Sequence, residues 1–109
     1  MSTRSRIGMQ LPDGRIESIY CHFDGYPSGV GTTLNKFYTD PEKVEDLINL
    51  GDISQLGEDI DSTVAYYRDR KEPYTKPRYD ATLGVFKRNI DYVDYGYVFT
   101  RDGEWVMFK

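Results

Sequence analysis

Cysteine and histidine, the residues that build disulfides and many transition-metal sites, are almost absent from this sequence. Each occurs once among the 109 residues, as Cys21 and His22. A single cysteine forms no intramolecular disulfide and no cysteine-rich zinc site, so the sequence excludes a disulfide-stabilised scaffold and fits a reducing compartment. We predict no cofactor and no metal site.

Long apolar runs and an excess of positive charge are also missing. The N-terminal stretch carries two arginines but no apolar core of a signal peptide, and no run is long enough to span a bilayer. The formal net charge of -4 repels phosphate backbones. We therefore expect a cytoplasmic protein with neither a membrane nor a nucleic acid as its partner, and an acidic surface that suits solubility or a basic partner.

Bulky aromatic residues are abundant. The chain contains ten tyrosines, five phenylalanines and one tryptophan, which is enough to close a compact interior. A chain of this length has too few residues for two independent cores. We expect residues 1–109 to form a single domain.

Alternating apolar residues predict a β-hairpin near each end of the chain. Apolar side chains alternate over residues 7–11 and 19–23 on either side of a Pro-Asp-Gly turn, and the aromatic runs 95–100 and 105–109 flank an Asp-Gly turn. Because almost every residue of the C-terminal pair is apolar, we expect both of its strands to be central in a sheet or covered on both faces. The sequence leaves open whether this hairpin is buried within one subunit or between two.

Helical spacing and capping residues predict three helices between the hairpins. We expect Ser28 to cap the first, Asp40 and Pro41 to begin the second, which stops at Gly51, and Asp80 to cap the third. The apolar positions that we expect these helices to bury are Val30, Leu34, Phe37, Tyr38, Val44, Leu47, Ile48, Leu83, Phe86 and Ile90.

The chain between the second and third helices is less regular. Residues 52–61 are expected to form a turn or a short helical loop, residues 62–68 a strand because of their β-branched and aromatic content, and residues 69–79 an exposed loop with two prolines. The element order is then ββ-α-α-β-α-ββ. This order predicts an α+β fold, with an antiparallel sheet of about five strands and helices packed mainly on one face.

Potentially reactive side chains gather near the end of the second predicted strand. Neighbouring strand residues point to opposite faces, so Cys21 and His22 do not form a nucleophile and base pair, and Cys21 is expected in the core. His22 and Asp24 share a face if the strand continues that far, and the carboxylate would then orient the imidazole as a general base or metal ligand. The structural alternative is a simple hydrogen bond or a solvated imidazole.

The glycine-rich residues 25–31, GYPSGVG, lead into the first predicted helix. Free backbone amides at such a position suit an anion, with Tyr26 as a stacking wall and with Arg68 or Arg70 if their loop folds towards Gly29. The structural alternative is that the glycines supply turn geometry and that the charged loop pairs with itself. The candidate ligand-binding residues are Tyr20, His22, Asp24, Tyr26, Ser28, Gly29, Arg68 and Arg70, and no catalytic residue is assigned.

Tyrosine is more frequent than a core of this size requires. Six tyrosines lie late in the chain, at positions 66, 67, 74, 79, 92 and 95. Tyrosine is enriched at recognition surfaces because it contributes a large contact area at low entropy cost. We expect some of these side chains to be exposed, either as a binding face or as an ordinary sheet surface with hydroxyls in water.

The segments YCHFDGYP (residues 20–27) and TVAYYRDR (residues 63–70) stand within a longer stretch, residues 6–70, that resembles small hypothetical proteins of tailed phages and prophages. The resemblance extends to the aromatic C-terminal hairpin. It implies a setting, a phage accessory protein in the bacterial cytoplasm, and no catalytic residues.

Together these observations predict a non-enzymatic interaction protein that modulates or inhibits a host or phage macromolecule. The first alternative is a binder of a small anionic ligand or nucleotide at residues 25–31. The second alternative is a metal-dependent hydrolase that uses His22 and Asp24.

Overall fold

A mixed seven-stranded sheet forms the centre of the fold, which is known from a computed structural model that describes residues 2–109. In chain order the elements are β1 (Ser5–Gln10), β2 (Ile16–Cys21), the π-helical turn η1 (Pro27–Gly31), α1 (Thr32–Phe37), α2 (Pro41–Asn49), β3 (Ile53–Gln55), β4 (Val64–Ala65), α3 (Tyr66–Arg70), β5 (Arg78–Asp80), α4 (Leu83–Arg88), β6 (Tyr95–Phe99) and β7 (Trp105–Phe108). The predicted α+β class is confirmed.

The sheet has the strand order β4-β3-β2-β1-β6-β7, with β5 paired to β2 beside β3. The prediction of a purely antiparallel sheet of about five strands is wrong, because β2 pairs with β3 in parallel and β1 pairs with β6 in parallel. Parallel neighbours need a crossover connection, and η1, α1 and α2 supply it between β2 and β3. The strand β3 was expected to be a turn, so this crossover could not be foreseen.

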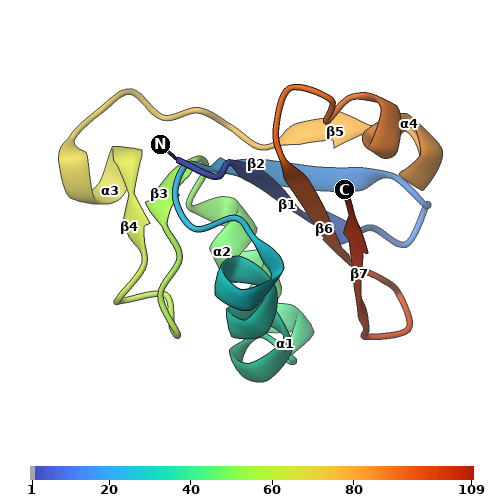
Figure 1. Ribbon diagram of the computed structural model, residues 1–109, viewed down its shortest axis with the longest axis horizontal. Helices are drawn as coiled ribbons and strands as arrows, with labels where there is room; N and C mark the ends of the chain where they lie inside the picture. Colours follow the sequence, from blue (N-terminus) through green and yellow to red (C-terminus); the bar gives the residue numbers. More distant parts are fainter. Residues whose placement is uncertain (1) are drawn as a thin grey trace.

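Helices lie on both sides of the sheet (Figure 1). The larger core lies under α1 and α2, where the predicted stripe Val44, Leu47 and Ile48 is fully buried. A smaller core on the opposite face joins α4 to the strands and consists of Ile16, Phe86, Ile90 and Val98. Our expectation that helices pack mainly on one face therefore holds for α1 and α2 and fails for α4.

The local start signals of the helices were read correctly in one case out of three. Asp40 caps α2 by accepting a hydrogen bond from the Glu42 amide at 3.0 Å, as predicted. Ser28 caps nothing, because η1 begins after Tyr26 without a side-chain cap. Thr82, rather than Asp80, caps α4, and Asp80 belongs to β5.

The chain between α2 and α4 also differs from its prediction. The strand expected over residues 62–68 shrinks to β4, and Tyr66 begins the short helix α3 instead. Residues 69–79 were expected to be loop, but Arg78 and Tyr79 pair with β2 as part of β5. Within residues 2–109, no helix has the length and apolar character needed to cross a membrane.

The C-terminal hairpin forms as predicted, and its two strands differ in burial. β6 is central and β7 is the outermost strand of the sheet. Val106 and Met107 are 37% and 47% exposed. The expectation that both strands are central or covered on both faces is thus wrong for β7.

Candidate functional site

The imidazole of His22 is held at both ring nitrogens by hydroxyl groups. The Tyr20 hydroxyl lies 2.8 Å from Nδ1, and the Ser2 hydroxyl lies 3.1 Å from Nε2. Tyr20 and His22 come together because strand residues two apart share a face. Burial raises the pKa of the Tyr20 phenol, and the nearby Arg4 charge opposes this shift.

Asp24 does not join this pair. Strand β2 ends at Cys21, and Asp24 adopts a left-handed backbone with φ of 59°. Its carboxylate accepts a hydrogen bond from the Tyr26 hydroxyl at 3.1 Å, which raises the pKa of that exposed phenol. The arrangement in which Asp24 orients His22 as a base is therefore not formed. Within residues 2–109, no group of three or more His, Cys, Asp or Glu side chains is placed to hold a metal ion.

Three amides of the glycine-rich residues 25–31 already have acceptors, and that of Gly25 donates to the Thr3 carbonyl at 2.8 Å. The Gly29 amide donates to the Tyr26 carbonyl at 2.9 Å, and the Val30 amide donates to the Asp24 carbonyl at 2.8 Å. A Cβ atom on Gly29 would lie 2.4 Å from the Asp24 carbonyl oxygen, so this position requires glycine for close approach. These contacts support the alternative interpretation, in which the glycines supply turn geometry instead of an anion site.

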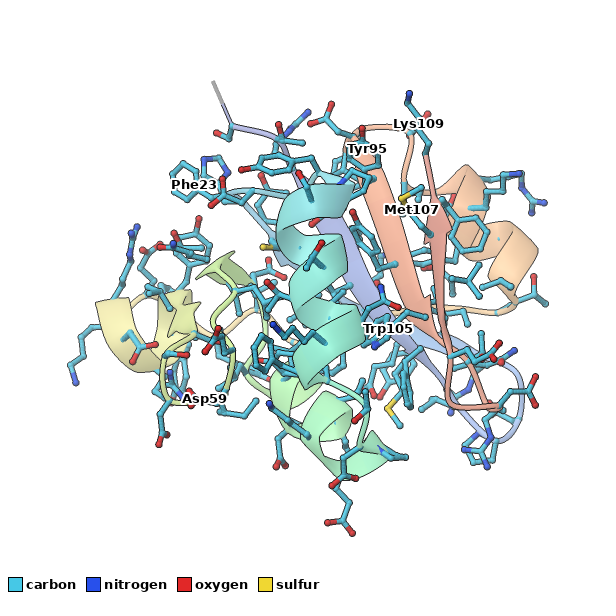
Figure 2. All side chains as sticks on the ribbon, turned by 60° about the horizontal axis from the view of Figure 1, so that its bottom comes forward. Phe23, Asp59, Tyr95, Trp105, Met107 and Lys109 are labelled. Carbon is cyan, nitrogen blue, oxygen red and sulfur yellow. The ribbon has the colours of Figure 1, made fainter. Side chains whose placement is uncertain are left out.

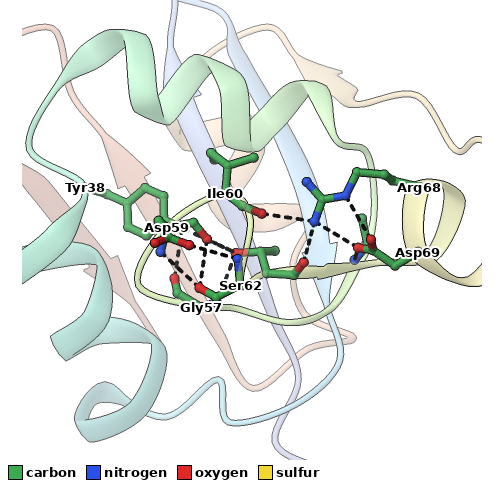
Figure 3. Close-up of polar contacts among 9 residues, drawn as sticks. Tyr38, Gly57, Asp59, Ile60, Ser62, Arg68 and Asp69 are labelled. Atoms are coloured by element: carbon green, nitrogen blue, oxygen red, sulfur yellow. Dashed lines mark hydrogen bonds and ion pairs between the residues drawn. The ribbon is translucent and has the colours of Figure 1, made fainter.

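Arg68 closes the 57–63 turn instead of facing Gly29 (Figure 3). Its Nη2 donates to the carbonyls of Ile60 at 3.0 Å and Thr63 at 2.7 Å, and the guanidinium also binds Asp69. The hydrogen bond from Arg68 lowers the pKa of the Asp69 carboxyl. The guanidinium of Arg70 lies 5.4 Å from the centre of the Tyr66 ring. Within the charged run, Arg68 pairs with Asp69, so the self-paired alternative is confirmed for these two residues.

The predicted ligand-binding residues therefore fall into three separate groups. Tyr20 lies on β2 and His22 directly follows it, whereas Asp24, Tyr26, Ser28 and Gly29 lie on the turn, and Arg68 and Arg70 lie on α3. The small cavity beside the turn, of about 110 Å³, is lined by no arginine. The two halves of the proposed anion site do not meet.

Tyr20 instead lines a cleft that sequence reasoning missed, of about 440 Å³, between the edge of β2 and α3. We call it the tyrosine cleft; its lining residues are Tyr20, Asp52, Tyr66, Glu72, Pro73 and Thr75. Asp52 joins its two walls, because its carboxylate accepts from the Tyr20 amide at 3.0 Å and its carbonyl accepts from the Tyr66 amide at 3.2 Å. The six residues include two carboxylates and no basic side chain.

Exposed aromatic rings stand beside the tyrosine cleft. Tyr67 and Tyr74 are 55% and 44% exposed, and their rings meet edge to face at 5.3 Å. The Tyr74 hydroxyl donates to the Asn49 carbonyl at 3.1 Å, which fixes the loop against the end of α2. The prediction that some late tyrosines are exposed is confirmed, and two of them, Tyr67 and Tyr74, gather here. Only the tyrosine content of residues 66–74 signalled this surface in the sequence.

Two arginines near the N-terminus, Arg4 before β1 and Arg6 within it, were also missed. Arg6 is 6% exposed, and its guanidinium donates to the Ser18 hydroxyl and carbonyl and to the Tyr92 hydroxyl. Arg4 donates to the Tyr92 carbonyl. Extending the alternation of the first strand back by one residue from Ile7 would have placed Arg6 on the face opposite Ile7. These contacts fasten the segment before β6 to the sheet.

Cys21 is fully buried, as predicted, and burial raises the pKa of its thiol from 9.0 to about 12.

We expect Cys21 of the folded protein at pH 8 to react with a thiol reagent only as fast as the protein unfolds locally, whereas Cys21 of the urea-unfolded chain reacts at once. Above pH 9 the unfolded thiol loses its proton while the native thiol keeps it. The contribution of the Cys21 thiol to the free energy of unfolding is therefore fully present below pH 9. It is lost as the pH rises from 9 to 12.

The measurement is thiol labelling with and without urea, together with urea unfolding at pH 8 and pH 10 for the wild type and Cys21→Ala. Fast labelling of the folded protein would contradict the burial of Cys21. An equal pH dependence in both proteins would contradict the direction of the pKa shift.

Comparison with protein-family models, with curated proteins and with solved structures finds no match to this chain. The resemblance of residues 6–70 to phage and prophage proteins therefore stays a prediction. The case for a function rests on the geometry of the chain itself.

Proposed function

We propose that the chain is a non-enzymatic interaction protein that binds a macromolecular partner through the tyrosine cleft and the neighbouring Tyr67 and Tyr74. The observation that carries the proposal is the combination of a cleft of about 440 Å³ with two tyrosine walls, two carboxylates and an exposed aromatic pair beside it. Rigid aromatic side chains at a concave surface are typical of the energetic centres of protein interfaces.

The chemistry of the cleft favours a basic side chain on the partner. Tyrosine rings attract ammonium and guanidinium groups through their faces, and carboxylates pair with the same groups. Asp52 and Glu72 supply the carboxylates and Tyr20 supplies a ring, whereas the Tyr66 ring already has the Arg70 guanidinium 5.4 Å from its centre. A lysine or arginine side chain of the partner therefore fits this cleft, and the net charge of -4 suits a basic partner as a whole.

The non-enzymatic character is supported by the states of two potentially reactive groups. The Asp24 carboxylate that would orient His22 as a base is bonded to Tyr26 instead. Burial keeps the Cys21 thiol protonated at neutral pH. The phage setting, the bacterial cytoplasm and an inhibitory or modulating effect on a host or phage macromolecule belong to the proposal through the sequence resemblance alone.

A small anionic ligand at residues 25–31 has weaker support. The Gly29 and Val30 amides that would bind it already donate within the turn, and the adjoining cavity holds only about 110 Å³. A metal-dependent hydrolase has weaker support still, because Asp24 is bonded to Tyr26 instead of His22.

The test is capture of partners from bacterial lysate by the immobilised wild-type chain and by Glu72→Lys. We expect Glu72→Lys to lose the specific partner, because it places a positive charge where the basic side chain binds, and we expect higher salt to weaken capture by the wild type. Glu45→Lys, on the exposed side of α2, makes the same charge change away from the cleft and serves as the control. Partners retained equally by Glu72→Lys, or no specific partner in repeated experiments, would contradict the proposal.

A further inference from the structure

Three strands, β4, β5 and β7, lie at outer edges of the sheet, and these edges are built differently; β5 has only three residues and carries Arg78 and Asp80. The edge at β4 has only two residues, its pairing with β3 is interrupted by a register shift, and α3 follows it directly. The edge at β7 has four consecutive apolar residues in unbroken register with β6. Proteins normally blunt exposed edges by shortness, bulges, proline or charge. The edges at β4 and β5 are blunted by shortness, and the edge at β7 is not.

Backbone groups at the β7 edge are free to pair with another strand. The Thr100 amide donates to the Glu104 carbonyl at 2.8 Å. Because hydrogen-bonded pairs alternate in an antiparallel ladder, Val106 and Phe108 direct their backbone groups towards β6. The backbone groups of Trp105 and Met107 then point outward, away from the sheet.

Side chains of β7 present apolar surface on both faces. Figure 2 shows Trp105 and Met107 on the face of the sheet that α1 and α2 cover. There the Trp105 indole donates a hydrogen bond to the Tyr38 carbonyl at 2.8 Å. Met107 lines an apolar groove of about 420 Å³ between β7 and α1. On the other face, Phe108 packs against Phe86 with ring centres 6.1 Å apart, next to the exposed Val106.

We propose that β7 pairs with β7 of a second copy of this chain, antiparallel and across a two-fold axis at Met107. This register places Met107 opposite its own copy, at the mouth of the groove beside α1, where the flexible thioether fills an irregular apolar space. It places Val106 opposite Phe108 of the second copy, so that exposed apolar side chains cover each other. It also places Lys109 opposite Trp105, where the ammonium group faces an indole ring.

The complementarity of the side chains selects this register over its neighbours. A two-fold axis perpendicular to the sheet passes midway between the two copies of one residue. The register centred on Phe108 pairs only Phe108 with itself and Met107 with Lys109, and the register on the other side has its axis at Val106. That register sets the Glu104 carboxylate opposite Phe108 and leaves Lys109 beyond the strand, opposite Gly103. Centring on Met107 gives three favourable kinds of side-chain pair and no unfavourable one. Strand addition at an open edge also forms main-chain hydrogen bonds.

The dimer surface is separate from the tyrosine cleft and does not depend on the proposed function.

The first test is the mass of the wild type by sedimentation equilibrium over a concentration series. We expect a dimer of twice 12.7 kDa, and we expect Met107→Lys to raise the dissociation constant at least about tenfold, because two ammonium groups then face each other at the axis. A wild type that stays monomeric at high micromolar concentration would overturn the proposal. So would a dimer that Met107→Lys leaves intact while circular dichroism shows it to be folded.

The register is tested by cross-linking through single cysteines introduced into β7, in a background where the only native cysteine is buried. Met107→Cys places two thiols directly opposite each other across the axis, so we expect it to form a disulfide-linked dimer several times faster than Val106→Cys. The two variants are matched, since both replace an exposed apolar residue of the same strand. Faster cross-linking of Val106→Cys, or no cross-linking of either variant, would overturn the arrangement.

Discussion

Replacing Phe86 with alanine is expected to lower the free energy of unfolding by about 3–5 kcal/mol, the usual cost of removing a fully buried aromatic ring. Phe86 is the centre of the smaller core, where α4 covers Ile16, Ile90 and Val98 on the face of the sheet opposite α1 and α2. It also contacts Phe108 of β7. The loss removes apolar contacts from both the sheet and the C-terminal hairpin.

Urea unfolding of Phe86→Ala measures this change, and Lys87→Ala on the exposed side of the same helix is the control, with an expected change within about 0.5 kcal/mol. The slope of the free energy against urea concentration should stay constant if the native state is otherwise intact. A loss below about 1 kcal/mol for Phe86→Ala would mean that α4 does not pack on the sheet as described.

Removing the aromatic pair beside the tyrosine cleft is expected to have the largest effect on partner binding. Tyr67→Ala combined with Tyr74→Ala should weaken affinity by at least about thirtyfold, which corresponds to about 2 kcal/mol, the threshold for an interface hot spot. Both rings are exposed and contact each other edge to face, so each supports the other in the free protein. Their replacement also removes the hydrogen bond that ties Tyr74 to Asn49.

Titration calorimetry with the captured partner measures the change in affinity. Tyr79→Ala is the matched control, because Tyr79 is 51% exposed but lies on β5, where its hydroxyl binds Glu17. We expect this variant to bind like the wild type. Equal losses for Tyr79→Ala and for the double variant would show that tyrosine content, rather than this surface, decides binding.

Elements with strong local signals could be predicted from the sequence. The N-terminal hairpin and α2 follow from alternation and from the Asp40-Pro41 start, which act within a few residues of chain. The strands β3 and β5 have three residues each, too few for a periodic pattern to identify. The parallel pairing of β1 with β6 joins segments about 90 residues apart, and no local signal encodes it.

The candidate site shows the same division between local and long-range information. Opposite faces for Cys21 and His22 followed from strand alternation alone. The tyrosine cleft combines residues 20, 52, 66 and 72–75, which only the fold brings together. The charge of Arg68 suggests a ligand-binding group, yet its guanidinium donates hydrogen bonds to the backbone carbonyls of Ile60 and Thr63. Every residue has a backbone carbonyl, so the sequence alone does not indicate which ones an arginine will bind.

Site-specific photo-cross-linking tests the central claim, that a partner binds at the tyrosine cleft, most directly. A photoreactive phenylalanine analogue replaces Tyr67 in one protein and Tyr79 in another, and each is irradiated in bacterial lysate. The account predicts a specific covalent adduct from position 67 that is lost on adding Glu72→Lys, and none from position 79. An adduct from position 79 alone, or from neither position while the partner is still captured, would contradict it.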